Sequence, residues 1–462
     1  MEIVLKPFKL GNQYYVYDRN TNKILAVPKQ DYEVLCSNQS STEKNAVLKK
    51  YQSKGFFLEN RLTEIKHPAN DFVTQFEEEN VTQLILQVTQ DCNLRCSYCY
   101  YVNESYRNRH HAKLNMSVDT ARKAMDYLLS HSVGKDNITL GFYGGEPLLR
   151  MDILKYCIEY MESQVQDRRI LFTLTTNGTL LTDDIIEYFI AHNVALFISL
   201  DGTKETHDRN RKFVNGHGSF DIVMWNVAHI KERHPEYFKT IYFNTVISPE
   251  MDMKCVRDYY SADEVLATAN FTSSTIQEFY TDDPPQYDDR LYIDSQYGEF
   301  KALLICAGRL SAKDMPFIYQ GDISDIRKLQ ENLHTDFLLP SAYHHGGPCI
   351  AGSRRLFVDV AGNFYPCERV SESSETMKIG SLEEGLNLEK VLNLINVGKI
   401  TENECKRCWA LVHCRICAAW ADNLTGLDKS KKLQACPLYK SSVLHRFKNV
   451  CALSQFTHHK IK

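Results

Sequence analysis

Three cysteines fall within eight residues of this 462-residue chain, in the segment Cys92-Asn93-Leu94-Arg95-Cys96-Ser97-Tyr98-Cys99. Three thiolates at this CxxxCxxC spacing can bind three irons of a [4Fe–4S] cluster and leave the fourth iron open to another ligand. A zinc site is the alternative, but zinc motifs usually combine CxxC knuckles with a fourth ligand close by. No further cysteine follows until Cys157, so the loop favours an iron–sulfur cluster.

The overall composition is that of an ordinary globular protein, with 43% hydrophobic and 24% charged residues. A net charge of -4 and a pI near 6.5 argue against a general nucleic-acid binder, which is normally basic. No apolar run approaches the ~20 residues of a membrane span, and the N-terminus lacks the layout of a secretory signal. We therefore expect a cytoplasmic protein that binds neither nucleic acid nor membrane and holds more than one domain.

The chain holds 15 cysteines, and seven of them lie between residues 349 and 436. Because a reducing cytosol keeps thiols free, a cysteine-rich intracellular chain indicates metal or redox chemistry before disulfides. The scattered cysteines outside the two groups are expected to be small buried hydrophobes; these are Cys36, Cys157, Cys255, Cys306 and Cys451.

From about residue 83 the chain repeats a strand followed by a helix. The expected strands are apolar runs without alternation, typical of buried parallel strands, at 83–89, 137–143, 170–176, 194–200 and 240–247. Amphipathic helices are expected at 118–131, 151–164, 183–192 and 220–234, with a less regular sixth unit over 253–280. These repeats predict an α/β fold with a parallel sheet, whose active site lies at the carboxyl ends of the strands.

The segments on either side of these repeats are expected to be different. Residues 1–80 are predicted to form a winged-helix-like domain, with a hairpin from the β-prone runs 14–17 and 23–27, helices near 30–36 and 43–54, and a strand at 55–58. The acidic run at 77–80 is interpreted as a linker. Residues 283–345 show little regular patterning, and 301–345 are taken as a bridge to 346–462, where metal is expected to replace a hydrophobic core.

Further motifs end the expected strands in a fixed order: Gly144-Gly145-Glu146-Pro147, then Thr176-Asn177-Gly178-Thr179, then Ser199-Leu200-Asp201-Gly202. Each alone is compatible with simple turn chemistry. Together with the cysteine loop they resemble the radical S-adenosylmethionine (SAM) superfamily. The resemblance implies a partial (βα)6 TIM-like barrel over 81–300, a [4Fe–4S] cluster on Cys92, Cys96 and Cys99, and SAM bound to its open iron. The SAM contacts that it implies are Tyr98, Gly144, Gly145, Glu146, Asn177, Ser199 and Arg211, while no catalytic acid or base stands out.

The C-terminal cysteines follow the pattern Cys349-x12-Gly362-x4-Cys367, then Cys405-x2-Cys408-x5-Cys414-x2-Cys417, then Cys436. This pattern resembles the SPASM extension of radical SAM peptide-modifying enzymes, which carries two auxiliary [4Fe–4S] clusters. The resemblance implies an outer cluster (auxiliary cluster II) on Cys405, Cys408, Cys414 and Cys436, and an inner cluster (auxiliary cluster I) on Cys349, Cys367 and Cys417, so that three clusters are expected in all. A pair of zinc knuckles is the alternative that the spacing alone leaves open.

Two features of this chain depart from the family pattern. The family usually has CxxxC where this chain has Cys414 and Cys417, and fully ligated members keep an extra cysteine between the positions of Cys349 and Cys367. The inner cluster is therefore expected to have an open iron, and a thiolate of the substrate is the soft ligand that such an iron prefers.

The N-terminal domain is similar in layout to the peptide-recognition elements of maturases that act on ribosomally made peptides. Such elements pair a leader peptide with an exposed strand edge, which is expected here within 14–28. The implied activity is the installation of thioether crosslinks in a cysteine-rich precursor peptide through a 5′-deoxyadenosyl radical, with electrons from a flavodoxin- or ferredoxin-type donor. The alternatives are a formylglycine-forming anaerobic sulfatase-type maturase, a carbon–carbon crosslinking peptide cyclase, and a non-catalytic zinc or iron–sulfur scaffold. An N-terminal domain that merely packs on the barrel is the alternative to peptide recognition.

Overall fold

Six consecutive parallel strands form one side of a ten-stranded sheet in the computed structural model, which describes residues 2–37, 42–101, 107–109, 111–311 and 320–456. The strands are β4 (Gln83–Thr89), β5 (Asn137–Gly144), β6 (Arg169–Thr176), β7 (Val194–Ser199), β8 (Tyr242–Ile247) and β9 (Asn270–Thr275), paired in that order. Every residue of β4 after the first is buried, as expected for a strand covered on both faces. The predicted parallel sheet and its α/β class are confirmed, and each predicted strand lies within two residues of its expected bounds.

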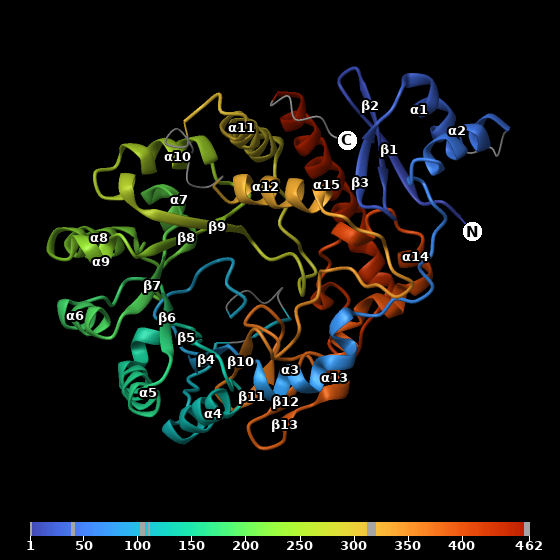
Figure 1. Ribbon diagram of the computed structural model, residues 1–462. Coiled ribbons are helices and arrows are strands. Elements are labelled where there is room, and N and C mark those ends of the chain that lie inside the picture. Colours follow the sequence, from blue (N-terminus) through green and yellow to red (C-terminus); the bar gives the residue numbers. More distant parts are fainter. Residues whose placement is uncertain (1, 38–41, 102–106, 110, 312–319, 457–462) are drawn as a thin grey trace.

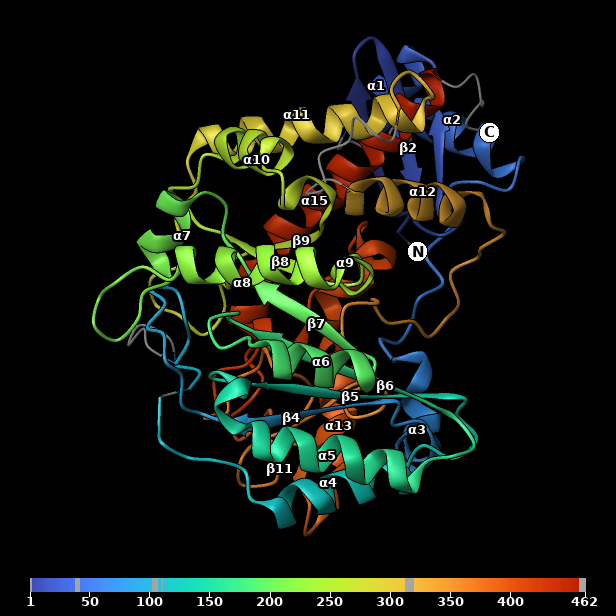
Figure 2. The ribbon, with the colours of Figure 1, turned by 90° about the vertical axis from the view of Figure 1, so that its left-hand side faces the viewer.

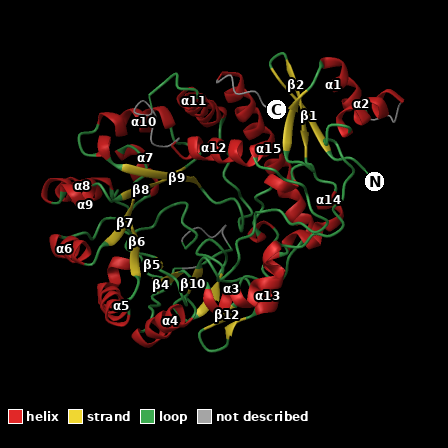
Figure 3. Ribbon diagram, in the orientation of Figure 1, coloured by secondary structure: helices red, strands yellow, loops and turns green. Residues whose placement is uncertain are grey.

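Helices cover the outer side of the curved sheet, while Figure 3 shows mainly loops inside the curve. The helices are α4 (Val118–Ser130), α5 (Met151–Gln164), α6 (Asp183–Ala191), α7 (Lys204–Asn210), α8 (Phe220–Arg233), α9 (Pro235–Phe238) and α10 (Met253–Ala262) (Figure 1). Side-chain N-caps fix where several of them begin, since Ser117, Thr182 and Asp252 each accept a hydrogen bond from the first turn that follows. All four predicted helices are confirmed, and the sixth unit supplies α10 and β9.

The N-terminal domain is a three-stranded antiparallel sheet with two helices: β1 (Leu5–Leu10), β2 (Gln13–Asp18), β3 (Lys23–Ala26), α1 (Lys29–Cys36) and α2 (Thr42–Gln52). Alternation along β2 sends Val16 into a core with α1 and α2, and it sends Tyr17 to the other face. There Tyr17 packs on Phe447 of the C-terminal helix with ring centroids 4.5 Å apart. Figure 2 shows these strands at the end of the molecule opposite α4 and α5.

The strand expected at 55–58 is absent, and this prediction was wrong. Phe57 has a φ of 54°, which a strand does not allow, and its fully buried ring packs on Tyr51 of α2. Its backbone N–H donates to a carboxylate oxygen of Asp18 at 2.9 Å. The apolar run therefore closes the core of the N-terminal domain as a turn.

The expected bridge is not irregular, because 283–345 contains two helices, α11 (Asp289–Cys306) and α12 (Gln320–His334). The amphipathic pattern of α11 was missed because its outer face is itself apolar; Tyr292, Ile293, Tyr297 and Phe300 are all exposed. Its inner face shares a core with α12, with the N-terminal strands and with the C-terminal helix. Among the described residues, none of the helices is both long and apolar enough to span a membrane.

The C-terminal segment adds four short strands to the edge of the sheet: β10 (Leu356–Val358), β11 (Asn363–Tyr365), β12 (Gly380–Ser381) and β13 (Gly385–Leu386). β10 pairs with β4 in parallel, and the others follow as antiparallel strands. Three helices complete it: α13 (Leu388–Ile395), α14 (Glu402–Lys406) and α15 (Lys429–Phe456). This segment is more regular than expected, since α15 is 28 residues long and carries the Phe447 contact described above.

The acidic run expected as a linker is the end of a helix, α3 (Val73–Glu79), which packs against α13. Glu77 is only 3% exposed, and neither of its carboxylate oxygens has a hydrogen-bond partner among the described residues. Burial raises the pKa of Glu77 to about 8. The linker prediction was wrong because the run was read as uniformly solvated, whereas one of its three glutamates points inward.

Replacing Glu77 with Gln should change how stability depends on pH. Since the folded protein holds this proton more tightly than the unfolded chain, the contribution of Glu77 is fully present below about pH 4.5 and is lost as the pH rises through about 8. The free energy of unfolding of the wild type should therefore fall by up to about 1.4 kcal/mol per pH unit in that window. Urea unfolding of Glu77→Gln should lack this slope, and the exposed neighbour variant Glu79→Gln should keep it. Parallel pH profiles for all three proteins would contradict the assignment.

Candidate functional site

The cysteine loop follows β4 directly and is held by the segment that follows α7. The backbone N–H of Arg95 donates to the Lys212 carbonyl (2.7 Å), and that of Ser97 donates to the Asn210 carbonyl (3.1 Å). The Arg95 guanidinium turns back and donates to the carbonyl of Cys92 at 2.6 Å. Backbone hydrogen bonds therefore fix the course of the loop across the ends of the strands.

The three thiols of this loop lie within electrostatic range of one another, since Cys92 interacts with both Cys96 and Cys99. Burial raises the pKa of Cys92 and of Cys96 to about 12. The Arg211 guanidinium beside Cys96 acts in the opposite direction and favours the thiolate. A set of half-buried thiols beside a cation suits an iron–sulfur cluster, whose irons bind thiolates.

The two glycines at the end of β5 are required by a close approach of backbones. Gly144 has a φ of 136°, and a Cβ added there would collide with the Thr89 carbonyl oxygen. A Cβ on Gly145 would collide with the Asp91 carbonyl oxygen in the same way. The end of β5 thus lies directly against the start of the cysteine loop, at a distance that only glycine permits.

Glu146, which completes that motif, is fully buried and ties β5 to β6. Its carboxylate accepts hydrogen bonds from the Asn177 N–H (2.7 Å), the Thr176 hydroxyl (2.7 Å) and the Leu148 N–H (3.1 Å). Burial raises the pKa of Glu146 to about 7, against these hydrogen bonds, which favour the charged form. Glu146 therefore holds the carboxyl ends of β5 and β6 together.

Asn177 joins the end of β6 to the cysteine loop. Its side-chain amide donates to the Asn93 side-chain oxygen at 2.8 Å and lies 3.9 Å from the Cys92 sulfur. The Asn93 amide donates in turn to the Thr179 hydroxyl at 2.8 Å. The structure thus brings together the cysteine loop and the motifs at the ends of β5 and β6.

A buried ion pair completes the site at the end of β7. Asp201 and Arg211 meet through two contacts, at 2.8 and 3.3 Å, and both side chains are almost fully buried. The Tyr98 hydroxyl donates to the same Asp201 carboxylate, and the guanidinium lies 5.4 Å from the centre of the Tyr98 ring. Ser199, the last residue of β7, is half-buried and comes two residues before Asp201. Two of the implied SAM contacts, Tyr98 and Arg211, therefore meet at one carboxylate.

Sequence reasoning did not assign a role to Asp201, although the SLDG motif contains it. The His207 ring lies between Asp201 and Ser219. Its Nδ1 accepts a hydrogen bond from the Asp201 N–H at 3.3 Å, and its Nε2 lies 3.0 Å from the Ser219 hydroxyl. Burial lowers the pKa of His207 to about 4, so the ring is neutral at physiological pH. His207 therefore positions Asp201, which in turn positions Arg211 and Tyr98.

The C-terminal cysteines lie near one another in two further groups. In the inner group, Cys417 interacts with Cys349, and Cys367 interacts with Cys417. The outer group consists of Cys405, Cys408, Cys414 and Cys436, each within electrostatic range of another member. No group of three or more His, Cys, Asp or Glu side chains in the described ranges is placed to hold a single metal ion.

The three thiol groups are connected in sequence through the side chains between them. Tyr100 is within electrostatic range of both Cys99 and Arg369, and Arg369 is within range of Cys417. Tyr439 of α15 interacts with Cys417 of the inner group and also with Cys414 of the outer group. The inner group is thus linked to the strand-end site on one side and to the outer group on the other.

A buried polar network that the sequence did not reveal joins β4 and the segment after the cysteine loop to the C-terminal segment. Arg109 pairs with Glu372 at 2.6 Å, and its guanidinium is completely buried over the ring of Phe357. Glu372 also accepts from the side-chain amide of Gln87 on β4 at 2.6 Å, and the same amide donates to the Tyr101 hydroxyl. These residues belong to no motif and lie far apart in the sequence, so only the fold could bring them together.

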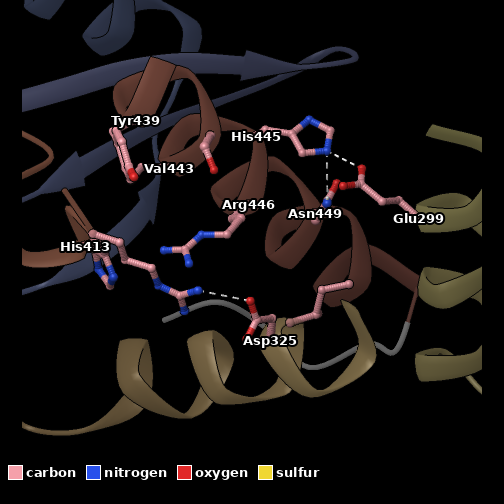
Figure 4. A pocket seen from close by; sticks show the side chains of 11 residues that line it. Glu299, Asp325, His413, Tyr439, Val443, His445, Arg446 and Asn449 are labelled. Atoms are coloured by element: carbon pink, nitrogen blue, oxygen red, sulfur yellow. Dashed lines mark hydrogen bonds and ion pairs between the residues drawn. The ribbon is translucent and has the colours of Figure 1, made fainter. Parts of the chain in front are cut away.

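A cavity of about 240 Å³ lies behind the outer thiol group, between α11, α12 and α15 (Figure 4). His413 and Arg415, the neighbours of Cys414, line it together with Arg446 of α15. Arg415 is paired with Asp325 at 3.2 Å. None of the implied SAM contacts lines this cavity, which is therefore separate from the strand-end site.

Comparison with known proteins agrees with this geometry. The sequence model described as the radical SAM superfamily matches residues 86–261, the part of the chain that holds the cysteine loop and the strand-end motifs. A structure of histidine-tagged anSMEcpe with bound AdoMet superimposes with a TM-score of 0.57 over 80% of this chain and 98% of that chain, at 19% identity. At this identity the superposition shows the shared fold.

Curated relatives are similar over different lengths. A cysteine-type anaerobic sulfatase-maturating enzyme of Clostridium novyi (strain NT) is 31% identical over 165 residues, 34% of this chain and 42% of the relative. This match thus spans less than half of the relative's length. The radical SAM cyclopropyl synthase TigE of Paramaledivibacter caminithermalis is 22% identical over 438 residues, 89% of this chain and 84% of that protein.

The parallel sheet and the motifs gathered at its strand ends define a domain whose family implies a [4Fe–4S] cluster and SAM. Residues 86–261 match the sequence model of the radical SAM superfamily, so the motifs at the strand ends lie within a radical SAM domain. The roles of individual residues in binding the cofactors stay predictions at this point.

Replacing Asp201 with Asn should destabilise the fold as well as the site. The substitution leaves the Arg211 guanidinium buried without its counter-charge, which costs roughly 3–5 kcal/mol when one partner of a buried pair is removed. Asp221→Asn is the matched control, because it breaks an exposed pair with Lys204 and should cost at most about 1 kcal/mol. Urea unfolding of both variants provides the comparison. Equal losses would mean that the Asp201–Arg211 pair contributes no more than a surface pair.

Proposed function

We propose that the protein is a radical SAM maturase that installs thioether links in a cysteine-rich, ribosomally made precursor peptide. The observation that carries this proposal is the inner group of three thiols, Cys349, Cys367 and Cys417, between the strand-end site and the outer group. Three protein thiols on a four-iron cluster leave one iron for a ligand from the substrate. Because iron–sulfur clusters prefer soft ligands, a cysteine of the peptide is the natural fourth ligand.

The donor sets in this chain fit the cofactors that this function needs. The first cluster would be held by Cys92, Cys96 and Cys99. A ligand bound to this cluster would lie beside the backbone of Gly144 and Gly145, which approaches the cysteine loop closely. When bound, this cluster and SAM supply the 5′-deoxyadenosyl radical that removes hydrogen from the peptide. The protein's own contribution is to orient Tyr98 and Arg211 through Asp201 and to keep the site dry, since that ion pair is buried.

The N-terminal sheet supports a role in holding the leader of such a peptide. The edge was expected within 14–28, and β2 is excluded because it pairs on both sides. β3 (Lys23–Ala26) is left as the edge strand of that range, and α12 contacts it. An extended leader added to β3 would gain main-chain hydrogen bonds in the mode known as strand addition. A structure of native anSMEcpe holds AdoMet together with the Kp18Cys peptide, so a peptide can be accommodated by this fold.

Two rival products are each supported by a specific observation. The similarity to TigE, a cyclopropyl synthase, extends over 89% of this chain and supports carbon–carbon bond formation, which requires no open iron in the inner cluster. The 31% identity to the sulfatase-maturating enzyme supports formylglycine formation, but it covers only 34% of the chain. The thioether product is preferred because it uses the incomplete inner group, and product analysis separates the three.

Two cysteine replacements should separate the first cluster from the inner one. Cys96→Ala removes a ligand of the SAM cluster and should abolish SAM cleavage altogether. Cys349→Ala should leave uncoupled SAM cleavage intact while eliminating the peptide product, because it affects only the inner group. Cys255→Ala is the matched control, since this exposed thiol on α10 belongs to none of the three groups. Both reactions are followed by chromatography of 5′-deoxyadenosine and of the peptide. Wild-type SAM cleavage in both variants would refute the cluster assignments.

Mass spectrometry of a co-encoded cysteine-rich peptide, after anaerobic reaction with reconstituted enzyme and SAM, tests the product. We expect a loss of two hydrogens per link and an equal loss of cysteines that react with an alkylating reagent, because a thioether consumes a thiol. The same mass loss with all thiols still reactive would establish carbon–carbon linkage instead. An unchanged peptide, together with conversion of a sulfatase-derived cysteine peptide, would show that the function is formylglycine formation.

A further inference from the structure

Two buried cations lie against the outer thiol group, and neither is used by the proposed reaction. The first is Lys432 of α15, whose side chain is 1% exposed. Its ammonium group donates to the Thr401 hydroxyl at 2.7 Å and lies 3.8 Å from the Cys405 sulfur. It is also within electrostatic range of Cys414 and Cys436. Lys432 thus adjoins three of the four thiols in the outer group.

The second cation comes from the opposite end of the chain. Arg19 lies in the turn between β2 and β3 of the N-terminal sheet and is fully buried. Its guanidinium donates to the Lys406 carbonyl at 2.7 Å and to the Cys408 carbonyl at 3.3 Å, within the outer cysteine loop. In the same turn, Asn22 forms a 2.6 Å hydrogen bond with His413. The N-terminal hairpin is therefore part of the wall around the outer group.

Neither cation forms an ion pair with a carboxylate within the part of the chain that the structure describes. Glu404, an acid near Lys432, is paired with Lys429 at 2.6 Å. Asp18, next to Arg19, accepts hydrogen bonds from the backbone N–H groups of Asn20 and Phe57 instead. A buried charge without a counter-charge is costly, so the outer group should supply the missing negative charge.

The inner group lacks such uncompensated cations among the described residues. Arg355, which lies near Cys367, is paired with Glu368 at 2.9 Å, so its charge is locally neutralised. Arg369, near Cys417, is exposed and screened by solvent. The excess of buried positive charge is therefore particular to the outer group.

We infer that Arg19 and Lys432 are fixed counter-charges of an outer iron–sulfur cluster and that they raise its reduction potential. This inference rests on the proposed function, which assigns a cluster to Cys405, Cys408, Cys414 and Cys436. A cluster with four thiolates carries net negative charge, and its reduction adds one electron and one more negative charge. Nearby cations in a poorly screened interior stabilise the reduced form more than the oxidised one. The contact from the Lys432 ammonium group to the Cys405 sulfur also raises the potential, because hydrogen bonds to the sulfurs stabilise the reduced cluster.

The test is an EPR-monitored redox titration of the reconstituted full-length protein, carried out without SAM. The outer cluster's signal is identified as the one lost in Cys405→Ala. Lys432→Met should lower the potential of that signal, so that the equilibrium constant for its reduction falls by roughly tenfold, or about 59 mV for one electron. Lys432→Arg should restore most of the potential, which a purely structural role would not require.

Lys429→Met is the matched control, because it removes the same charge from the same helix at an exposed position. It should leave the potential unchanged. Arg19→Met is a second, independent variant, since it removes the other cation from the N-terminal domain. An unchanged potential in iron-loaded Lys432→Met or Arg19→Met overturns the inference. Failure of both variants to hold iron overturns it as well, because the two cations would then be needed for cluster assembly. If Cys405→Ala loses no iron, the cluster assignment of the proposed function fails, which is a different result.

Discussion

β10 joins the sheet beside β4 in parallel, with Leu356 and Val358 opposite Leu84 and Leu86. β4 leads directly into the cysteine loop, and β10 leads through β11 to Cys367. This pairing places the C-terminal segment directly against the strand that leads into the cysteine loop. The pairing has only three residues on each strand.

So short a pairing needs support, and the buried network around Arg109 provides it. Gln87 of β4, Arg109 after the cysteine loop and Glu372 after β11 meet where the two halves of the chain touch. A charged pair in an apolar interior is stabilising only if its geometry is right, so it specifies one arrangement rather than adding much stability. The apolar residues of β10 and β11 share one core with those of β4 and β5, which supplies the stability itself.

The parallel sheet could be predicted because it depends on a local pattern. Uninterrupted apolar runs such as 83–89 identify buried strands, whereas the ligand sets inferred from cysteine spacing stay predictions. Residues that act through long-range contacts could not be predicted in this way. Glu77 lies in an acidic run that looks solvated, the apolar outer face of α11 hides its helical period, and Arg109 finds Glu372 across 263 positions of sequence. In each case the tertiary environment, and not the local pattern, decides where the side chain lies.

The N-terminal domain has two faces with different partners, which argues against a freely attached module. Val16 and Leu25 close a core with α1 and α2, whereas Tyr15 and Tyr17 pack with α15. The helix that receives them also carries Lys432 and Cys436, so the sheet that would hold a leader peptide is connected to the outer thiol group through one continuous helix. Arg19, in the turn of this sheet, is also hydrogen-bonded to the segment that carries Cys405 and Cys408. The N-terminal sheet and the outer thiol group are therefore in direct contact, so a displacement of one would be transmitted to the other.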